Sequence, residues 1–80
     1  MTKKDVFQKL EEIFRDVFDD DTIKLREQTV AADIEGWDSL QNIHILVAIE
    51  EEFGVRVTIE DAAKIENVGQ MVDLIERKAE

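Results

Sequence analysis

The sequence predicts an all-α domain, a four-helix bundle with a short third helix and a long loop between helices 1 and 2. Apolar residues recur at helical spacing in three segments, at about residues 3–18, 39–53 and 68–79. The chain contains no proline, and each of these segments follows a residue suited to cap a helix. With 80 residues the chain is long enough for one domain only, covering residues 1–80.

The first predicted helix, at about residues 3–18, has its apolar residues along one stripe. Thr2 and Asp5 resemble a capping box in which aspartate replaces the usual glutamate. Such a stripe, rich in phenylalanine, is typical of a helix face that packs in a core. The stripe consists of Val6, Phe7, Leu10, Ile13, Phe14, Val17 and Phe18.

The regular pattern stops between Asp19 and Trp37, a segment long enough to be functional or wrongly assigned. The acidic run at residues 19–21 resembles the start of a calcium-binding loop. However, Lys24 stands where such a loop needs glycine, and Ile23 stands where it needs an oxygen ligand. We therefore expect a solvated helix exit, followed by an ordered crossover that apolar residues anchor. These anchors are Ile23, Leu25, Val30 and Ile34.

A second helix is predicted at about residues 39–53, with Asp38 as its N-cap and Gln41 at the reciprocal position of a capping box. Gly54 suits the left-handed position after its end, with apolar Val55 next. The apolar residues spread around most of the helix, which predicts burial on several sides and a central place in the bundle. They are Ile43, Ile45, Leu46, Val47, Ala48 and Ile49.

Residues 55–59 alternate between apolar and polar side chains as a short strand would, but a single strand has no partner in this chain. We therefore expect an extended link into a short third helix at about residues 59–65, which Thr58 opens. Asn67 predicts the cap of the last helix, at about residues 68–79.

Composition excludes several classes of function. The absence of cysteine and the single histidine argue against disulfides and against a metal site built on thiolates or imidazoles. The formal net charge of −10 argues against a nucleic acid partner and favours proteins with basic surfaces. No apolar run approaches the roughly 20 residues of a membrane span, and the N-terminus lacks the apolar region of a secretory signal. We therefore expect a soluble, cytoplasmic monomer.

Ser39 is the residue on which the functional hypotheses turn, and the first hypothesis is catalysis. A serine nucleophile needs a base, and His44 is the only histidine. A separation of five residues places His44 about 140° around the helix axis from Ser39, so the two side chains point apart. The chain also has no glycine-rich phosphate loop and no distinctive carboxylate pair. The sequence therefore argues against an enzyme.

The second hypothesis is that Ser39 is modified. It stands at a helix start, where unpaired N–H groups and the helix dipole favour an anion such as a phosphodiester. The alternative is that Asp38 and Ser39 are simply capping residues. The residue chemistry alone leaves both interpretations open.

The segment Asp38-Ser39-Leu40, followed by an apolar helix that ends in Glu50-Glu51-Glu52-Phe53-Gly54-Val55, resembles the corresponding part of acyl carrier proteins. The similarity in the order of elements extends over nearly the whole chain. The resemblance implies the helical bundle of that family and no enzymatic activity. It also implies that Ser39 receives 4′-phosphopantetheine from a phosphopantetheinyl transferase. The thiol of this arm would carry acyl groups as thioesters.

The resemblance implies further roles around Ser39. Asp38 would assist recognition by the transferase in addition to capping the helix. Other positions would dock on acyl-loading and acyl-processing enzymes with basic surfaces. They are Leu40, Gln41, Ile43, His44, Glu50, Glu51 and Glu52. The alternative for Leu40 and Ile43 is core packing, and the alternative for the three glutamates is a solvated helix end.

Two positions depart from the pattern of fatty-acid carriers, because Gln41 and His44 stand where that group commonly has acidic residues. Gly36 and Trp37 before the aspartate resemble stand-alone carriers of specialised pathways. The cargo and the pathway, whether fatty-acid, polyketide or more specialised, stay open. A discrete aminoacyl carrier, such as a peptidyl or D-alanyl carrier, is the nearest alternative. From another class, the alternative is a small acidic helical adaptor without a prosthetic group.

Overall fold

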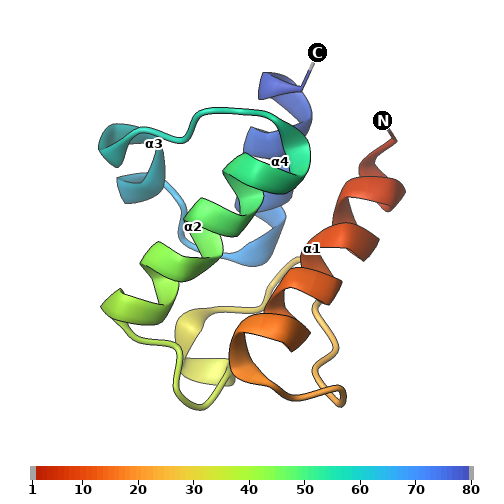
Figure 1. Ribbon diagram of the computed structural model, residues 1–80, viewed down its shortest axis with the longest axis vertical. Coiled ribbons are helices and arrows are strands. Elements are labelled where there is room, and N and C mark those ends of the chain that lie inside the picture. The colour runs from red at the N-terminus through yellow and green to blue at the C-terminus, as the bar shows by residue number, and fades with distance from the viewer. Residues whose placement is uncertain (1, 80) are drawn as a thin grey trace.

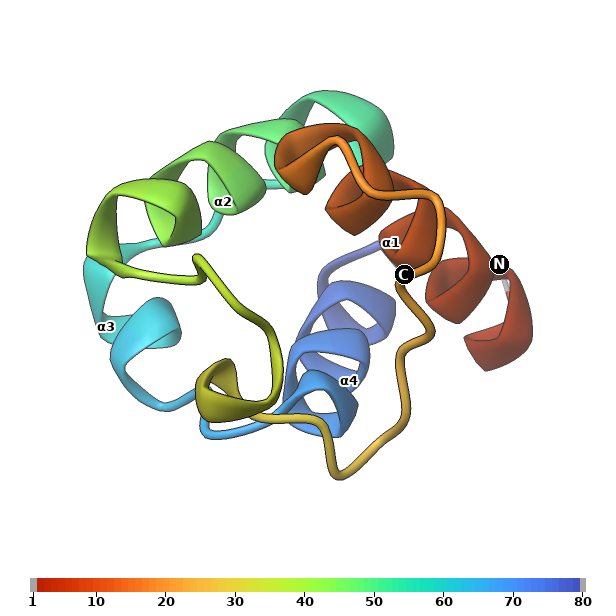
Figure 2. The ribbon, with the colours of Figure 1, turned by 90° about the horizontal axis from the view of Figure 1, so that it is seen from below.

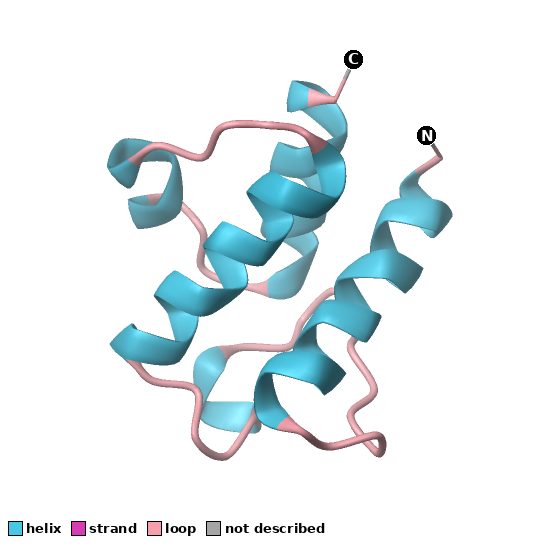
Figure 3. Cartoon of the chain, in the orientation of Figure 1, coloured by secondary structure: helices cyan, strands magenta, loops and turns pink. Residues whose placement is uncertain are grey.

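The computed structural model describes residues 2–79, and within them it contains helices and loops but no strand. The four α-helices are α1 (Lys3–Phe18), α2 (Ser39–Phe53), α3 (Ile59–Ala63) and α4 (Val68–Lys78). α3, with five residues, is the shortest, and Figure 1 and Figure 3 show the long connection between α1 and α2. The predicted all-α bundle with a short third helix is therefore confirmed.

The helix ends follow the capping residues. Thr2 and Asp5 form the predicted capping box of α1, and Gly54 ends α2 in the left-handed conformation at φ 64°. The predicted end of α3 at residue 65 is wrong by two residues, since the helix ends at Ala63. The N–H of Lys64 bonds to the carbonyl of Asp61 at 3.2 Å, a tighter turn that does not continue the α-helix. α4 ends one residue earlier than predicted.

α1, rather than α2, is the helix at the centre of the packing. Among the long helices, α1 packs closely against both α2 and α4, as Figure 2 shows along the axis of the bundle. The expectation of a central α2 is wrong because only Ile45 and Ile49 of that helix are buried. Of its other apolar residues, Leu46, Ala48 and Phe53 are half-buried against the core, whereas Leu40, Ile43 and Val47 are exposed. The core cluster comprises Val6, Leu10, Ile13, Phe14, Leu25, Ile45, Ile49, Val68, Met71, Val72 and Ile75.

The long loop is ordered because it is tied to α1 by hydrogen bonds that the sequence pattern does not reveal. The N–H of Leu25 donates to the Glu11 carboxylate at 2.9 Å, and the Arg15 guanidinium donates to the carbonyl of Ile23 at 2.9 Å. Leu25 is buried, whereas Ile23 and Ile34 are half-buried. The prediction that Val30 is a fourth anchor is wrong, because its side chain is exposed.

The same loop crosses the start of α4. The N–H of Val68 donates to the carbonyl of Thr29, and the N–H of Gly69 donates to the carbonyl of Glu27, both at 2.9 Å. Two of the N–H groups that a helix start leaves unpaired are therefore satisfied by the loop. A Cβ atom at position 69 would lie 3.0 Å from the Glu27 carbonyl oxygen, so glycine permits this close approach.

Within residues 2–79, no helix combines the length and the apolar character that crossing a bilayer would require.

Candidate functional site

Asp38 caps the start of α2 and leaves the next residue free. Its carboxylate accepts a hydrogen bond from the N–H of Gln41 at 2.9 Å, as predicted. The reciprocal bond predicted for Gln41 is absent, because the Gln41 side-chain oxygen lies 3.1 Å from Nδ1 of His44 instead. Ser39 is exposed, and its hydroxyl makes no hydrogen bond among residues 2–79. Ser39 is therefore not the cap.

The first turn of α2 also keeps backbone donors available. The N–H of Asn42 bonds to the carbonyl of Asp38 at 2.9 Å, in addition to the bond from Gln41 to the carboxylate. The N–H groups of Ser39 and Leu40 have no acceptor in the described part of the chain. An anion covalently attached to the Ser39 hydroxyl fits this environment, since it meets unpaired donors and the positive end of the helix dipole.

His44 does not serve Ser39 as a base. Its ring contacts Gln41, and no hydrogen bond joins it to Ser39 in residues 2–79. The described residues also contain no group of three or more His, Cys, Asp or Glu side chains that could hold a metal ion. Among residues 2–79, the Ser39 hydroxyl therefore has neither a hydrogen-bonded base nor a metal-binding cluster beside it.

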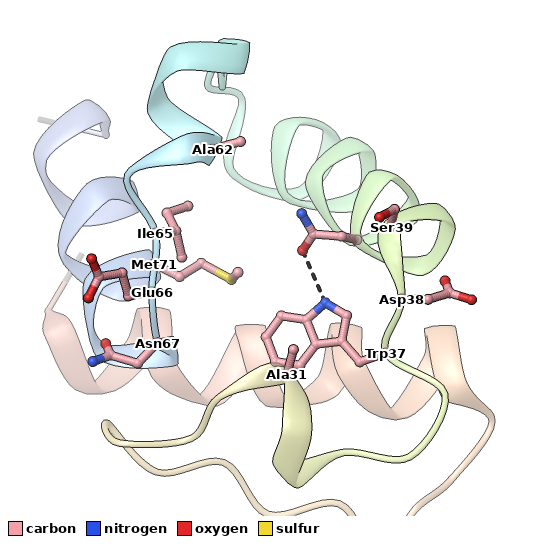
Figure 4. Close-up of a pocket in the computed structure, with 10 residues that line it drawn as sticks. Ala31, Trp37, Asp38, Ser39, Ala62, Ile65, Glu66, Asn67 and Met71 are labelled. Atoms are coloured by element: carbon pink, nitrogen blue, oxygen red, sulfur yellow. Dashed lines mark hydrogen bonds between the residues drawn. The ribbon is translucent and has the colours of Figure 1, made fainter.

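A cleft of about 350 Å³ opens beside Ser39, between the start of α2, the long loop and the α3–α4 connection. Figure 4 shows Ser39 and Asp38 at its rim, with Ile65 and Met71 on the opposite side. The lining residues are Ala31, Trp37, Asp38, Ser39, Asn42, Ala62, Ile65, Glu66, Asn67 and Met71. A chain attached to Ser39 can therefore lie in the cleft or extend away from it.

Trp37 joins this cleft to the core. Its ring packs edge-to-face on Phe14, with centroids 5.0 Å apart and an interplanar angle of 86°. Its indole N–H donates to the side-chain oxygen of Asn42 at 3.1 Å. Gly36, with φ at +88°, turns the chain into this position. Sequence reasoning missed Asn42, although its position three residues after Ser39 places both on one face of the helix.

The apolar residues predicted for docking are exposed. Leu40 and Ile43 retain 61% and 56% of their accessible surface, and Val47 retains 47%. Their spacing of three and four residues forms one stripe along α2. The alternative that Leu40 and Ile43 pack in the core is therefore wrong. The stripe begins directly after Ser39.

The three glutamates at the end of α2 differ from one another. Glu50 is half-buried, and its carboxylate accepts the N–H of Val57 at 2.9 Å, which holds the link to α3. Glu52 pairs with Lys9 of α1 at 2.9 Å. Glu51 is exposed and has no partner in the described part of the chain. Glu51 is thus the residue of the three that is most available to a partner.

Beyond the cleft, an ion pair fastens α3 to α4. Lys78 lies 2.8 Å from the Asp61 carboxylate, which also accepts the N–H of Thr58. The hydrogen bond from Lys78, helped by the N–H and hydroxyl of Thr58, lowers the pKa of Asp61 to about 2. This contact fixes the short helix that precedes the cleft wall at Ile65.

A family model described as the phosphopantetheine attachment site matches residues 8–75 of this chain. The chain belongs to this family. Among similar proteins, the acyl carrier protein of Clostridium acetobutylicum is 32% identical over 75 residues, covering 94% of this chain and 97% of that protein. The acyl carrier protein of Solidesulfovibrio magneticus is 36% identical over 73 residues, covering 91% and 94%.

A solved structure of an acyl carrier protein has the same fold as this chain. The holo acyl carrier protein from Geobacter metallireducens superposes with a TM-score of 0.87 at 38% identity, covering 91% of this chain and 84% of that one. The chain is therefore an acyl carrier protein whose prosthetic group is 4′-phosphopantetheine. Its family consists of carriers that are not themselves catalytic.

Proposed function

We propose that Ser39 is the residue to which 4′-phosphopantetheine is attached. One observation supports this most strongly: the only serine of the chain is an exposed first residue of α2 whose hydroxyl has no other hydrogen bond in residues 2–79. Its Oγ would lose its proton and form a phosphodiester bond with the pantetheine-side phosphorus of coenzyme A, as the pyrophosphate bond breaks and adenosine 3′,5′-bisphosphate leaves. The unpaired N–H groups of the first turn would stabilise the new anion. When bound, the arm supplies a terminal thiol that forms thioesters with acyl groups.

Asp38 has two roles in this proposal. One carboxylate oxygen caps α2 through the N–H of Gln41. The other oxygen has no hydrogen-bond partner in the described residues, and it points away from the cleft with the rest of the side chain in Figure 4. This oxygen is therefore free to contact the transferase, including a metal ion held there.

Partner enzymes would dock on the apolar stripe of Leu40, Ile43 and Val47, with neutral Gln41 and His44 beside it. The net charge of −10 would steer basic surfaces toward the carrier, and Glu51 would contribute directly. The partners in this proposal are the transferase and enzymes that load or process acyl groups. Gln41 and His44 favour a specialised pathway over general fatty-acid synthesis. We propose further that the carrier works as a cytoplasmic single-domain monomer without its own catalytic activity.

Mass spectrometry tests the attachment site. The protein would be incubated with coenzyme A and a promiscuous phosphopantetheinyl transferase, then measured intact and after digestion. We expect one phosphopantetheine per chain, on the peptide that contains Ser39. An unmodified chain after exposure to several competent transferases, or an adduct on a threonine, would contradict the proposal.

A further inference from the structure

Asn42 lines the cleft next to Ser39, and its amide is oriented so that it can donate hydrogen bonds to an acceptor atom of a ligand. We propose that Asn42, oriented by Trp37, donates a hydrogen bond to a carbonyl oxygen of the arm or of its acyl cargo in the cleft. This inference rests on the proposed attachment at Ser39. Trp37 is then a positioning residue, and Asn42 is the group that touches the ligand.

The indole decides which way the Asn42 amide points. An indole N–H is a donor only, so the atom that faces it at 3.1 Å must be the amide oxygen. The amide nitrogen of Asn42 then carries two N–H donors elsewhere. No acceptor for them exists among residues 2–79. Asn42, which lines the cleft, therefore offers N–H donors there, while its amide oxygen already accepts from the indole.

Trp37 is held firmly enough to impose this orientation. Its ring is half-buried and packs edge-to-face against Phe14, which is fully buried in the core. An aromatic pair of this geometry contributes packing beyond simple area burial. Reorienting the Asn42 amide would leave the indole N–H facing a second donor, which is unfavourable. The donor direction in the cleft is therefore a property of the fold.

The position of Asn42 matches the path of a group attached at Ser39. The two residues are separated by three positions, so they share a helix face, and both line the same cleft. The far side of the cleft includes apolar Ile65 and Met71 (Figure 4). An attached chain that folds inward therefore meets the Asn42 donors before the apolar side. An amide carbonyl of the arm, or a 3-oxo group on a short cargo, has the acceptor that these donors need.

Nuclear magnetic resonance of the side-chain amide tests the inference directly. Four forms of 15N-labelled protein would be compared: apo, holo, hexanoyl-loaded and 3-oxohexanoyl-loaded. A downfield shift of the Asn42 side-chain N–H signals from apo to holo identifies the arm as the acceptor. A shift that appears only with 3-oxohexanoyl identifies the cargo. Signals that stay unchanged in all four forms overturn the inference.

Two variants with a matched control separate this contact from effects of charge. Asn42→Asp keeps an oxygen for the indole but replaces the two donors by an acceptor. Gln41→Glu adds the same charge one residue away, on a side chain outside the cleft. Trp37→Phe keeps the ring and removes the donor that orients the amide.

The expected result follows from the loss of one hydrogen bond. We expect the docked population of the arm, measured from arm–protein nuclear Overhauser effects, to fall about five-fold in Asn42→Asp and in Trp37→Phe. Gln41→Glu should leave it unchanged, because Gln41 does not line the cleft and the isolated carrier has no partner enzyme in this measurement. Equal losses in Asn42→Asp and Gln41→Glu would overturn the inference even if Trp37→Phe fails to fold. If wild type does not accept the arm at all, the attachment proposal fails as well. If it accepts the arm without an Asn42 response, only this inference fails.

Discussion

The side of the molecule built by α1, the long loop and α4 differs sharply from the start of α2. α1 contributes four buried residues and α4 contributes six, whereas α2 contributes only two. Lys3 of α1 pairs with both the loop and α4, since it lies 3.1 Å from Glu27 and 3.3 Å from Asp73. The start of α2 instead exposes Leu40 and Ile43 beside an open cleft. The fold is held mainly by one region, and the other leaves apolar side chains and a cleft open to solvent.

An aromatic contact joins the core to the start of α2, in addition to the packing of Ile45 and Ile49. Phe14 belongs to the core, and Trp37 packs on it while also bonding to Asn42 at the cleft. Trp37 therefore couples the packing of the core to the position of Asn42 in the cleft.

The largest effect is expected from Phe14→Ala, because Phe14 is fully buried and supports Trp37. Truncation of a buried phenylalanine costs about 3–5 kcal/mol of unfolding free energy. Leu40→Ala, on the exposed stripe, should change it by no more than about 0.5 kcal/mol. Urea denaturation of both variants measures the difference. Similar losses in the two variants would show that the regions are not energetically distinct.

Asp38→Ala should have an intermediate effect, since it removes the side chain that caps α2. Loss of such a cap costs about 1 kcal/mol. Gln28→Ala, at an exposed loop position, is the control and should be nearly neutral. The same denaturation experiment applies. An Asp38 variant as stable as this control would mean that the cap contributes nothing to the fold.

The unfolding free energy of the protein should depend on pH through Asp61. Its contacts with Lys78 and Thr58 lower its pKa to about 2, below the ordinary value of 3.8. The carboxylate therefore contributes stability that is fully present above about pH 4 and is lost as the pH falls toward 2. Asp61→Asn should melt at a lower temperature than wild type at pH 7, and the difference should shrink below pH 4. A difference that is constant from pH 7 to pH 2 would rule out this origin.

The helices were predictable from local chemistry, and the loop path was not. Thr2, Asp38 and Gly54 mark helix ends by their own side chains or by their backbone freedom. The bonds from Leu25 to Glu11 and from Val68 to Thr29 join residues far apart in the chain, so no local pattern announces them.

For the site, the motif was sufficient to single out Ser39 and Asp38 but not the surroundings. The half-burial of Glu50 depends on the fold of the α2–α3 link, which brings the N–H of Val57 to its carboxylate. The cleft depends on Ile65 and Met71, which come from a different part of the chain. Contacts between distant segments also decide which apolar side chains stay exposed. Ile43 is apolar and yet exposed, because no other segment covers it.

The double change Gln41→Asp with His44→Glu should leave stability nearly unchanged, because both side chains bond chiefly to each other. It should raise turnover with general fatty-acid enzymes several-fold, through faster association with basic docking sites. The gain should be larger at low ionic strength. Steady-state acyl transfer to wild-type and variant holo-proteins at two salt concentrations measures it. Wild-type turnover equal to that of a standard fatty-acid carrier would contradict a specialised role for these positions.

Ser39→Ala tests the proposed attachment site most directly, because Ser39 is proposed to carry the arm while Asp38, and not Ser39, caps α2. Loading by the transferase and the thermal midpoint would be measured on the same preparation, next to wild type. We predict no phosphopantetheine on the variant and a midpoint within about 2 °C of wild type, because an exposed hydroxyl without a hydrogen bond contributes little stability. A variant that still accepts the arm, or one that melts far below wild type, would contradict the account.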